Sequence, residues 1–117
     1  MNGGVRVQDL SLYFRALADR KRFRIVQFLA DHEQVRVTEL GEHLRLSQPL
    51  ISWHLRVLRR AGIVKTRRSG REVLCSLNRR ALEAYEQRVD EMFGLRGAEP
   101  TTSTDAQRPM EAVRHGA

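Results

Sequence analysis

The chain has 117 residues, a net charge of +7 and one cysteine. A chain of this length forms one domain with little core to spare, and its apolar runs are all too short to cross a bilayer. The N-terminal residues lack the apolar segment of a secretory signal, and one cysteine excludes an internal disulfide framework. These observations predict a cytoplasmic protein with no membrane partner.

The positive charge is concentrated in one part of the chain. Ten basic residues and one acidic residue lie between Arg45 and Arg80, and the rest of the chain is close to neutral. A localised basic block in a small domain is typical of proteins that bind a polyanion, although solvated basic faces also occur in proteins that do not. The charge alone therefore favours a nucleic-acid partner.

The first half of the chain predicts three helices. Apolar residues at helical spacing indicate a first helix from about Val7 to Ala18. Asp19 is the expected N-cap of the second helix. We interpret Asp31 to Val37 as a loop, after which Thr38 is the expected N-cap of a short third helix.

A fourth helix begins sharply at a serine followed by a proline in its first turn. Ser47 is a good N-cap, and Pro49 is tolerated because first-turn amides have no helical acceptor. Gly62 ends this helix. Its apolar residues at i, i+4 and i+7 predict one buried stripe. They are Ile51, Leu55 and Leu58.

After this helix the hydrophobic residues no longer follow helical spacing but recur at every second position, as in a strand. Ile63 to Arg67 and Glu72 to Leu77 predict two short strands, and Gly70 supplies the positive φ of the turn between them. A last helix is predicted from Arg79 to Phe93.

Together these elements predict a mainly α fold with a small β-hairpin. About five helices plus a two-stranded wing correspond to a winged helix-turn-helix plan. We assign residues 1–96 to this DNA-binding and dimerisation domain. Residues 97–117 lack an apolar pattern that would offset the entropy of ordering, so we predict a disordered C-terminal tail.

In a helix-turn-helix, two helices are joined by a tight turn, here near residues 45–46. The second helix, called the recognition helix, enters the major groove of double-stranded DNA with its N-terminal end toward the base edges. Side chains outside the buried stripe are expected to point outward, and glutamine, serine and arginine are suited to reading bases. These outward residues are Gln48, Ser52, Trp53, His54 and Arg56. Further along, Arg59 suits a backbone phosphate, and the wing arginines suit a minor groove or flanking phosphates. The wing arginines are Arg67, Arg68 and Arg71.

The sequence resembles the ArsR/SmtB family of bacterial transcriptional repressors between about Leu10 and Phe93. The matching segments are FRALAD at 14–19, RFRIV at 22–26, LSQPLISWHLRVLRRAGIV at 46–64 and RSGR at 68–71. The resemblance implies a homodimer, joined by its first and last helices, that blocks a promoter and releases it on a signal. It also implies DNA contacts by Ser47, Gln48, Ser52 and His54, and Pro49 belongs to the same motif.

The first and last helices are more apolar than a surface helix needs. These residues either complete the core of one subunit or form a dimer interface, and a small domain that reads two half-sites favours the interface. The predicted interface residues are Leu10, Tyr13, Phe14, Leu17, Leu82, Tyr85, Val89 and Met92.

No metal site or cofactor is expected from the usual patterns. The family's Cys-x-Cys ligand positions match Arg36 and Thr38, which are poor ligands for a soft metal, and the last helix carries acids but no histidine. Cys75 is expected to be a small buried residue. A nickel- or zinc-responsive regulator with a non-standard histidine site across the dimer, involving residues such as His32 and His43, is the alternative, and the effector is left open between a metal and a small molecule.

Two other function classes are less consistent with the sequence. An enzyme would need a nucleophile with a base in reach, and the only suggestive group, Ser47, Ser52 and His54, lies on the helix expected to read DNA. A protein-interaction module without DNA would not need the basic block. We therefore predict a DNA-binding transcriptional regulator, a repressor that binds an inverted-repeat operator as a homodimer.

Overall fold

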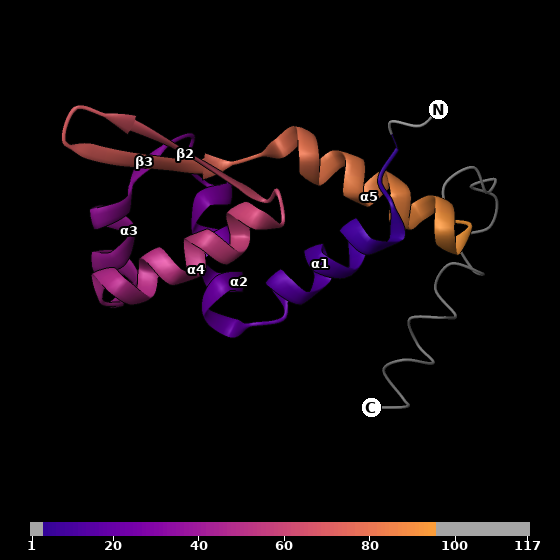
Figure 1. The fold of residues 1–117 in the computed structure, drawn as a ribbon, viewed down its shortest axis with the longest axis horizontal. Helices are drawn as coiled ribbons and strands as arrows, with labels where there is room; N and C mark the ends of the chain where they lie inside the picture. The colour runs from indigo at the N-terminus through magenta and orange to yellow at the C-terminus, as the bar shows by residue number, and fades with distance from the viewer. Residues whose placement is uncertain (1–3, 96–117) are drawn as a thin grey trace.

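The computed structural model describes residues 4–95, which form five helices and a three-stranded antiparallel sheet (Figure 1). The elements are α1 (Val7–Leu17), α2 (Arg20–Ala30), β1 (Val35–Arg36), α3 (Val37–Leu44), α4 (Gln48–Arg60), β2 (Val64–Ser69), β3 (Glu72–Leu77) and α5 (Arg79–Phe93). The predicted winged helix-turn-helix is confirmed. The predicted tail at 97–117 lies outside the described residues. None of the five helices is both long and apolar enough to span a membrane.

The sheet has one strand more than the predicted wing. Its order is β1-β3-β2, and Val35 pairs with Cys75 while Arg36 pairs with Leu74. The segment interpreted as a loop therefore contains a strand near its end. Strands are recognised in a sequence by the alternation of apolar and polar residues, and two residues are too few to show it. Because β1 leads directly into α3, this pairing fixes the start of the helix-turn-helix against the wing.

Two predicted helix caps are present and one is not. The Asp19 carboxylate accepts a hydrogen bond from the Arg22 amide at 3.0 Å, and the Ser47 hydroxyl accepts one from the Leu50 amide at 3.4 Å. The predicted cap at Thr38 is wrong. The N-cap of α3 is Arg36, which makes no side-chain capping bond, since the extended backbone of β1 leads straight into the helix.

The hydrophobic core lies between α2, α3, α4 and the inner face of the sheet. Its largest fully buried side chains are Ile25, Leu29, Leu40, Ile51, Leu58, Ile63 and Cys75. The predicted buried stripe of α4 is confirmed. Burial raises the pKa of the Cys75 thiol to about 11, and the thiol donates a hydrogen bond to the Val35 carbonyl at 3.4 Å, so this cysteine is a packing residue.

The helix α5 contributes no fully buried residue to this core. It lies with α1 at the end of the molecule opposite the tip of the wing (Figure 1). Tyr85 of α5 contacts the C-cap of α4, since its hydroxyl donates a hydrogen bond to the Ala61 carbonyl at 2.7 Å. The Tyr85 ring also packs on the ring of Tyr13, with centroids 4.4 Å apart.

Candidate nucleic-acid interface

The outer face of α4 carries a row of exposed polar side chains. Gln48, Ser52 and Arg56 follow at intervals of four residues, so they lie along one side of the helix. Pro49 is exposed beside this row, and the Trp53 side chain is 51% exposed. These five predicted residues therefore share one accessible surface, as groove reading requires.

The wing presents its arginines to solvent. Arg67, Arg68 and Arg71 are exposed, and Arg67 donates a hydrogen bond to the Gln34 side chain at 3.1 Å. Within residues 4–95, none of the three forms an ion pair with a carboxylate. Their charge is therefore available to phosphates.

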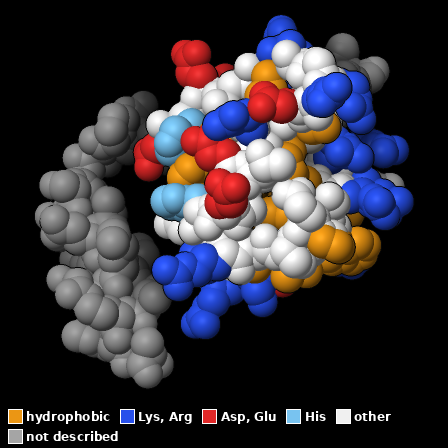
Figure 2. Space-filling model, turned by 90° about the vertical axis from the view of Figure 1, so that its left-hand side faces the viewer, with side chains coloured by type: hydrophobic (Ala, Val, Ile, Leu, Met, Phe, Trp, Pro, Cys, Tyr) orange, Lys and Arg blue, Asp and Glu red, His pale blue; other side chains and the backbone are white. Residues whose placement is uncertain are grey.

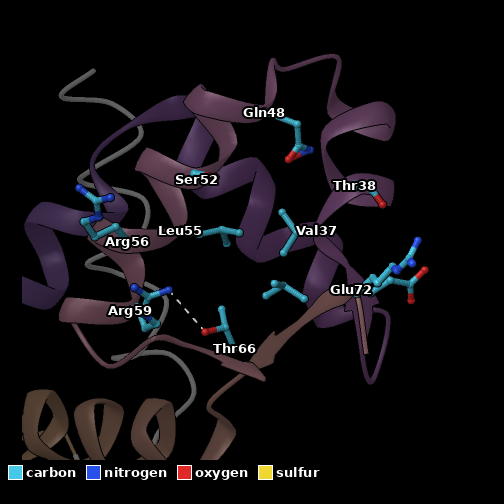
Figure 3. A pocket seen from close by; sticks show the side chains of 11 residues that line it. Val37, Thr38, Gln48, Ser52, Leu55, Arg56, Arg59, Thr66 and Glu72 are labelled. Atoms are coloured by element: carbon cyan, nitrogen blue, oxygen red, sulfur yellow. Dashed lines mark hydrogen bonds between the residues drawn. The ribbon is translucent and has the colours of Figure 1, made fainter. Parts of the chain in front are cut away.

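A hollow of about 430 Å³ separates the row on α4 from the wing (Figure 3). Arg59 crosses one side of it and donates a hydrogen bond to the Thr66 hydroxyl at 3.4 Å. The lining residues are Val37, Thr38, Gln48, Ser52, Leu55, Arg56, Arg59, Thr66, Arg71, Glu72 and Val73. Of these, Thr66 and Val73 were not among the predicted site residues. The alternation of the strands could have placed both on the inner face with Cys75, because Thr66 pairs with Cys75 and Val73 lies two residues away.

The charge is distributed unevenly over this end of the molecule. Figure 2 views it from the side of the wing tip and α3, and a group of Lys and Arg side chains lies along the right-hand edge of the face, with others at the top and at the lower left. Acidic and histidine side chains lie toward the centre and the opposite edge (Figure 2). The asymmetry produces a local positive field of the kind that attracts a polyanion.

His54 does not face outward, and this part of the sequence prediction is wrong. Its side chain is 5% exposed and belongs to the buried face of α4 together with Leu55 and Leu58. The physical reason is its position three residues after Ile51, which places it inside the apolar stripe rather than beside it. A buried His54 has no route to a base edge.

Instead, His54 forms part of a polar cluster with the start of α2. A guanidinium has no acceptor, so Arg22 Nη1 donates to His54 Nδ1, at 3.3 Å, and the imidazole proton belongs on Nε2. Arg22 is itself held, since its Nε donates to the Ala16 carbonyl at 2.7 Å. His54 Nε2 is buried without a hydrogen-bond partner among the described residues. Burial, more than any neighbouring charge, lowers the pKa of His54, and the nearby Asp19 partly opposes this.

The predicted interface residues of α1 and α5 fall into three groups. Phe14 and Met92 are 49% and 46% exposed, which leaves an apolar surface uncovered in one subunit. Leu10 is only 3% exposed, so its assignment to an interface is wrong and it belongs to the interior of the subunit. The half-buried residues are Tyr13, Leu17, Leu82, Tyr85 and Val89. Further exposed apolar side chains of α1, α5 and the residues just after α5 are Val7, Leu12, Phe93 and Leu95.

Two histidines of the described residues, His32 and His43, pack against the same aromatic ring. The rings of His32 and His43 each lie 4.3 Å from the ring of Phe28. Within residues 4–95, no group of three or more His, Cys, Asp or Glu side chains is arranged to hold a metal ion. A histidine site shared between two subunits stays a prediction.

Comparison with known proteins places this arrangement among bacterial regulators. Residues 19–66, which include the helix-turn-helix, match the model of the family described as bacterial regulatory protein, arsR family. The chain is 34% identical over 79 residues to the transcriptional activator HlyU of Vibrio cholerae, a match that covers 68% of this chain and 72% of HlyU. It is 48% identical over 63 residues to the transcriptional repressor SmtB of Mycobacterium tuberculosis, which covers 54% of this chain and 46% of SmtB.

The solved structure of reduced HlyU from Vibrio cholerae superposes with a TM-score of 0.60 at 30% identity, covering 74% of this chain and 90% of HlyU. The chain spans between 46% and 66% of the length of three of the curated relatives that it matches. Family model, sequence identity and fold agree. The chain belongs to the ArsR family of bacterial regulatory proteins.

Proposed function

We propose that this protein is a transcriptional repressor that binds an inverted-repeat DNA operator as a homodimer. The observation that carries the proposal is the exposed row of Gln48, Ser52 and Arg56 along α4, next to wing arginines that have no carboxylate partner within residues 4–95. Amide, hydroxyl and guanidinium groups at the start of a helix suit base edges in the major groove, and the wing suits the flanking backbone. The relatives include a repressor, SmtB, and an activator, HlyU.

A dimer accounts for the uncovered apolar surface at the other end of the subunit. Pairing α1 and α5 about a two-fold axis would cover Phe14 and Met92 and would present two recognition helices to one face of the duplex. Two such helices read half-sites about one helical turn apart, or a small multiple of that. The symmetry of the protein would therefore appear in the operator.

Selection of bound duplexes from a randomised pool, followed by footprinting, tests this proposal. We expect the selected DNA to contain an imperfect inverted repeat, protected over both half-sites at one dimer per duplex. A single unsymmetrical half-site bound by a monomer would contradict the dimeric arrangement. Selection that enriches no sequence would contradict specific DNA recognition itself.

A further inference from the structure

The hollow between the recognition helix and the wing has a feature that DNA binding does not require. Its volume of about 430 Å³ is that of a small-molecule site, for which about 300–1,000 Å³ is usual. Reading base edges and holding phosphates needs polar groups along a surface. These two tasks do not account for an apolar part within the hollow.

The centre of the hollow is made of aliphatic side chains from three elements. Leu55 of α4 and Val37 of α3 point toward each other in Figure 3, and Val73 of β3 completes the apolar lining. Leu55 is 3% exposed, whereas Val37 and Val73 are half-buried. A ligand with an apolar body would therefore bury two partly exposed valines, which favours binding.

The edge of the hollow is positively charged. Arg56, Arg59 and Arg71 line it, and within the described part of the chain none of them pairs with a carboxylate. The one acid of the lining, Glu72, is already held by Arg36, with Nη1 and Oε2 3.3 Å apart. Three arginines with no acid left to neutralise them favour an anionic group, which guanidinium binds with charge-assisted hydrogen bonds.

We propose that this hollow binds a small amphipathic anion, with an aromatic or aliphatic body over the valines and a carboxylate, sulfonate or phosphate head at the arginines. Gln48, Ser52 and Arg56 line the hollow and also form the proposed reading surface, so the bound anion and DNA exclude each other. This second part rests on the proposed function. The anion would release the operator by direct competition.

Anilinonaphthalene sulfonate, an apolar fluorophore with one anionic group, is a suitable probe of the full chain. We expect saturable binding at one site per subunit. Its uncharged analogue N-phenylnaphthylamine and the variant Arg59→Gln should each show affinity weaker by about tenfold or more, because each loses a charge-assisted contact. Equal affinity for the two probes would overturn the proposal, since binding would then be apolar only.

Two filling variants locate the probe. Val73→Phe places a larger side chain in the hollow, and Thr38→Phe fills it from an exposed position of α3 that carries no packing constraint. Both should weaken probe binding by about tenfold or more. Val7→Phe, which makes a similar enlargement at an exposed position of α1, should leave probe binding unchanged. Filling variants that fold, as judged by thermal melting, and keep full probe affinity would place the probe elsewhere and overturn the proposal.

The competition is measured separately with a fluorescein-labelled random duplex. Saturating probe should release this DNA from the wild type but not from Val73→Phe. DNA that stays bound while the hollow is occupied would overturn the competition. A wild type that binds the probe in the hollow but binds no duplex would contradict the proposed function and leave the ligand site standing.

Discussion

Gly62 lies just after the end of α4 and close to Tyr85 of α5. Its φ is +75°, and an added Cβ would lie 3.1 Å from the Tyr85 hydroxyl oxygen. Gly70 has a similar φ of +65° but no atom within 4 Å of an added Cβ. An alanine in the left-handed conformation costs about 1–2 kcal/mol of folding free energy at either position. At Gly62 only, the contact of the added Cβ with the Tyr85 hydroxyl increases this cost. We expect Gly62→Ala to lower the free energy of unfolding in urea by about 1 kcal/mol more than Gly70→Ala.

The source of that difference can be tested in a Tyr85→Phe background, which lacks the hydroxyl. There the two alanine variants should lose the same stability relative to Tyr85→Phe itself. If the difference between them persists without the hydroxyl, the contact is not its cause.

His54 makes stability depend on pH in a defined direction. Burial, Arg22 and Lys21 lower its pKa, and Asp19 raises it, with a net decrease from the ordinary value of 6.5. The unfolded chain therefore takes up a proton at a higher pH than the folded chain, so this histidine costs no stability above 6.5 and destabilises the fold as the pH falls below it.

Urea titrations at about pH 7.5 and about pH 5.5 check this expectation. His54→Asn is the control, because its amide oxygen accepts from Arg22 and it does not titrate. We expect the wild type to lose more stability than the variant between the two pH values. Equal losses would mean that His54 titrates alike in the folded and unfolded chains.

At the scale of elements, the sequence predicts where the recognition helix α4 begins and ends, but not all of the side chains that it buries. The stripe of Ile51, Leu55 and Leu58 followed from spacing, and the same spacing includes His54 at i+3. We predicted an exposed His54 because its imidazole is polar, and the sequence does not reveal that Arg22 of another helix is its partner. Periodicity was the better guide here than residue type.

The segment before α3 was missed for a different reason. β1 consists of two residues whose only signal is pairing with β3, some 40 positions away along the chain. The Thr38 cap was wrong, and the loop predicted at 31–37 holds only for residues 31–34, because local propensity cannot express such a long-range constraint. The hollow could not be predicted either, since its lining requires the relative placement of α3, α4 and the wing.

The recognition helix and the wing should contribute differently to binding. A base contact by Gln48 carries sequence information worth about 1–3 kcal/mol, whereas a phosphate contact by Arg68 adds affinity for any duplex. We expect Gln48→Ala to weaken binding to the selected operator and to leave binding to random DNA almost unchanged. Arg68→Ala should weaken both and lower the salt slope by about one unit.

Salt titrations of both variants on both duplexes provide the measurement. Ser69→Ala, at an uncharged position of the same wing, is the matched control and should bind both duplexes as the wild type does. Equal losses on operator and random DNA for Gln48→Ala would mean that α4 is not oriented in the groove as proposed.

At the scale of the whole molecule, the uncovered end of the subunit is the region that the proposed dimer must bury. Phe14→Asp combined with Met92→Asp should yield a monomer in light scattering, because a carboxylate at an apolar interface loses hydration without gaining a partner. Phe23→Asp, also 49% exposed in the wild type but on α2, should remain a dimer. A double variant that still scatters as a dimer would place the interface elsewhere.

The absence of a fully buried residue in α5 has a consequence for the proposed dimer. In that dimer α5 would gain further burial by association, so mass action would enter the unfolding equilibrium. The melting temperature should then rise with protein concentration, and newly made subunits at low abundance would be the ones most open to proteolysis at α5. The level of expression would set the lifetime of each molecule as well as the occupancy of its operator.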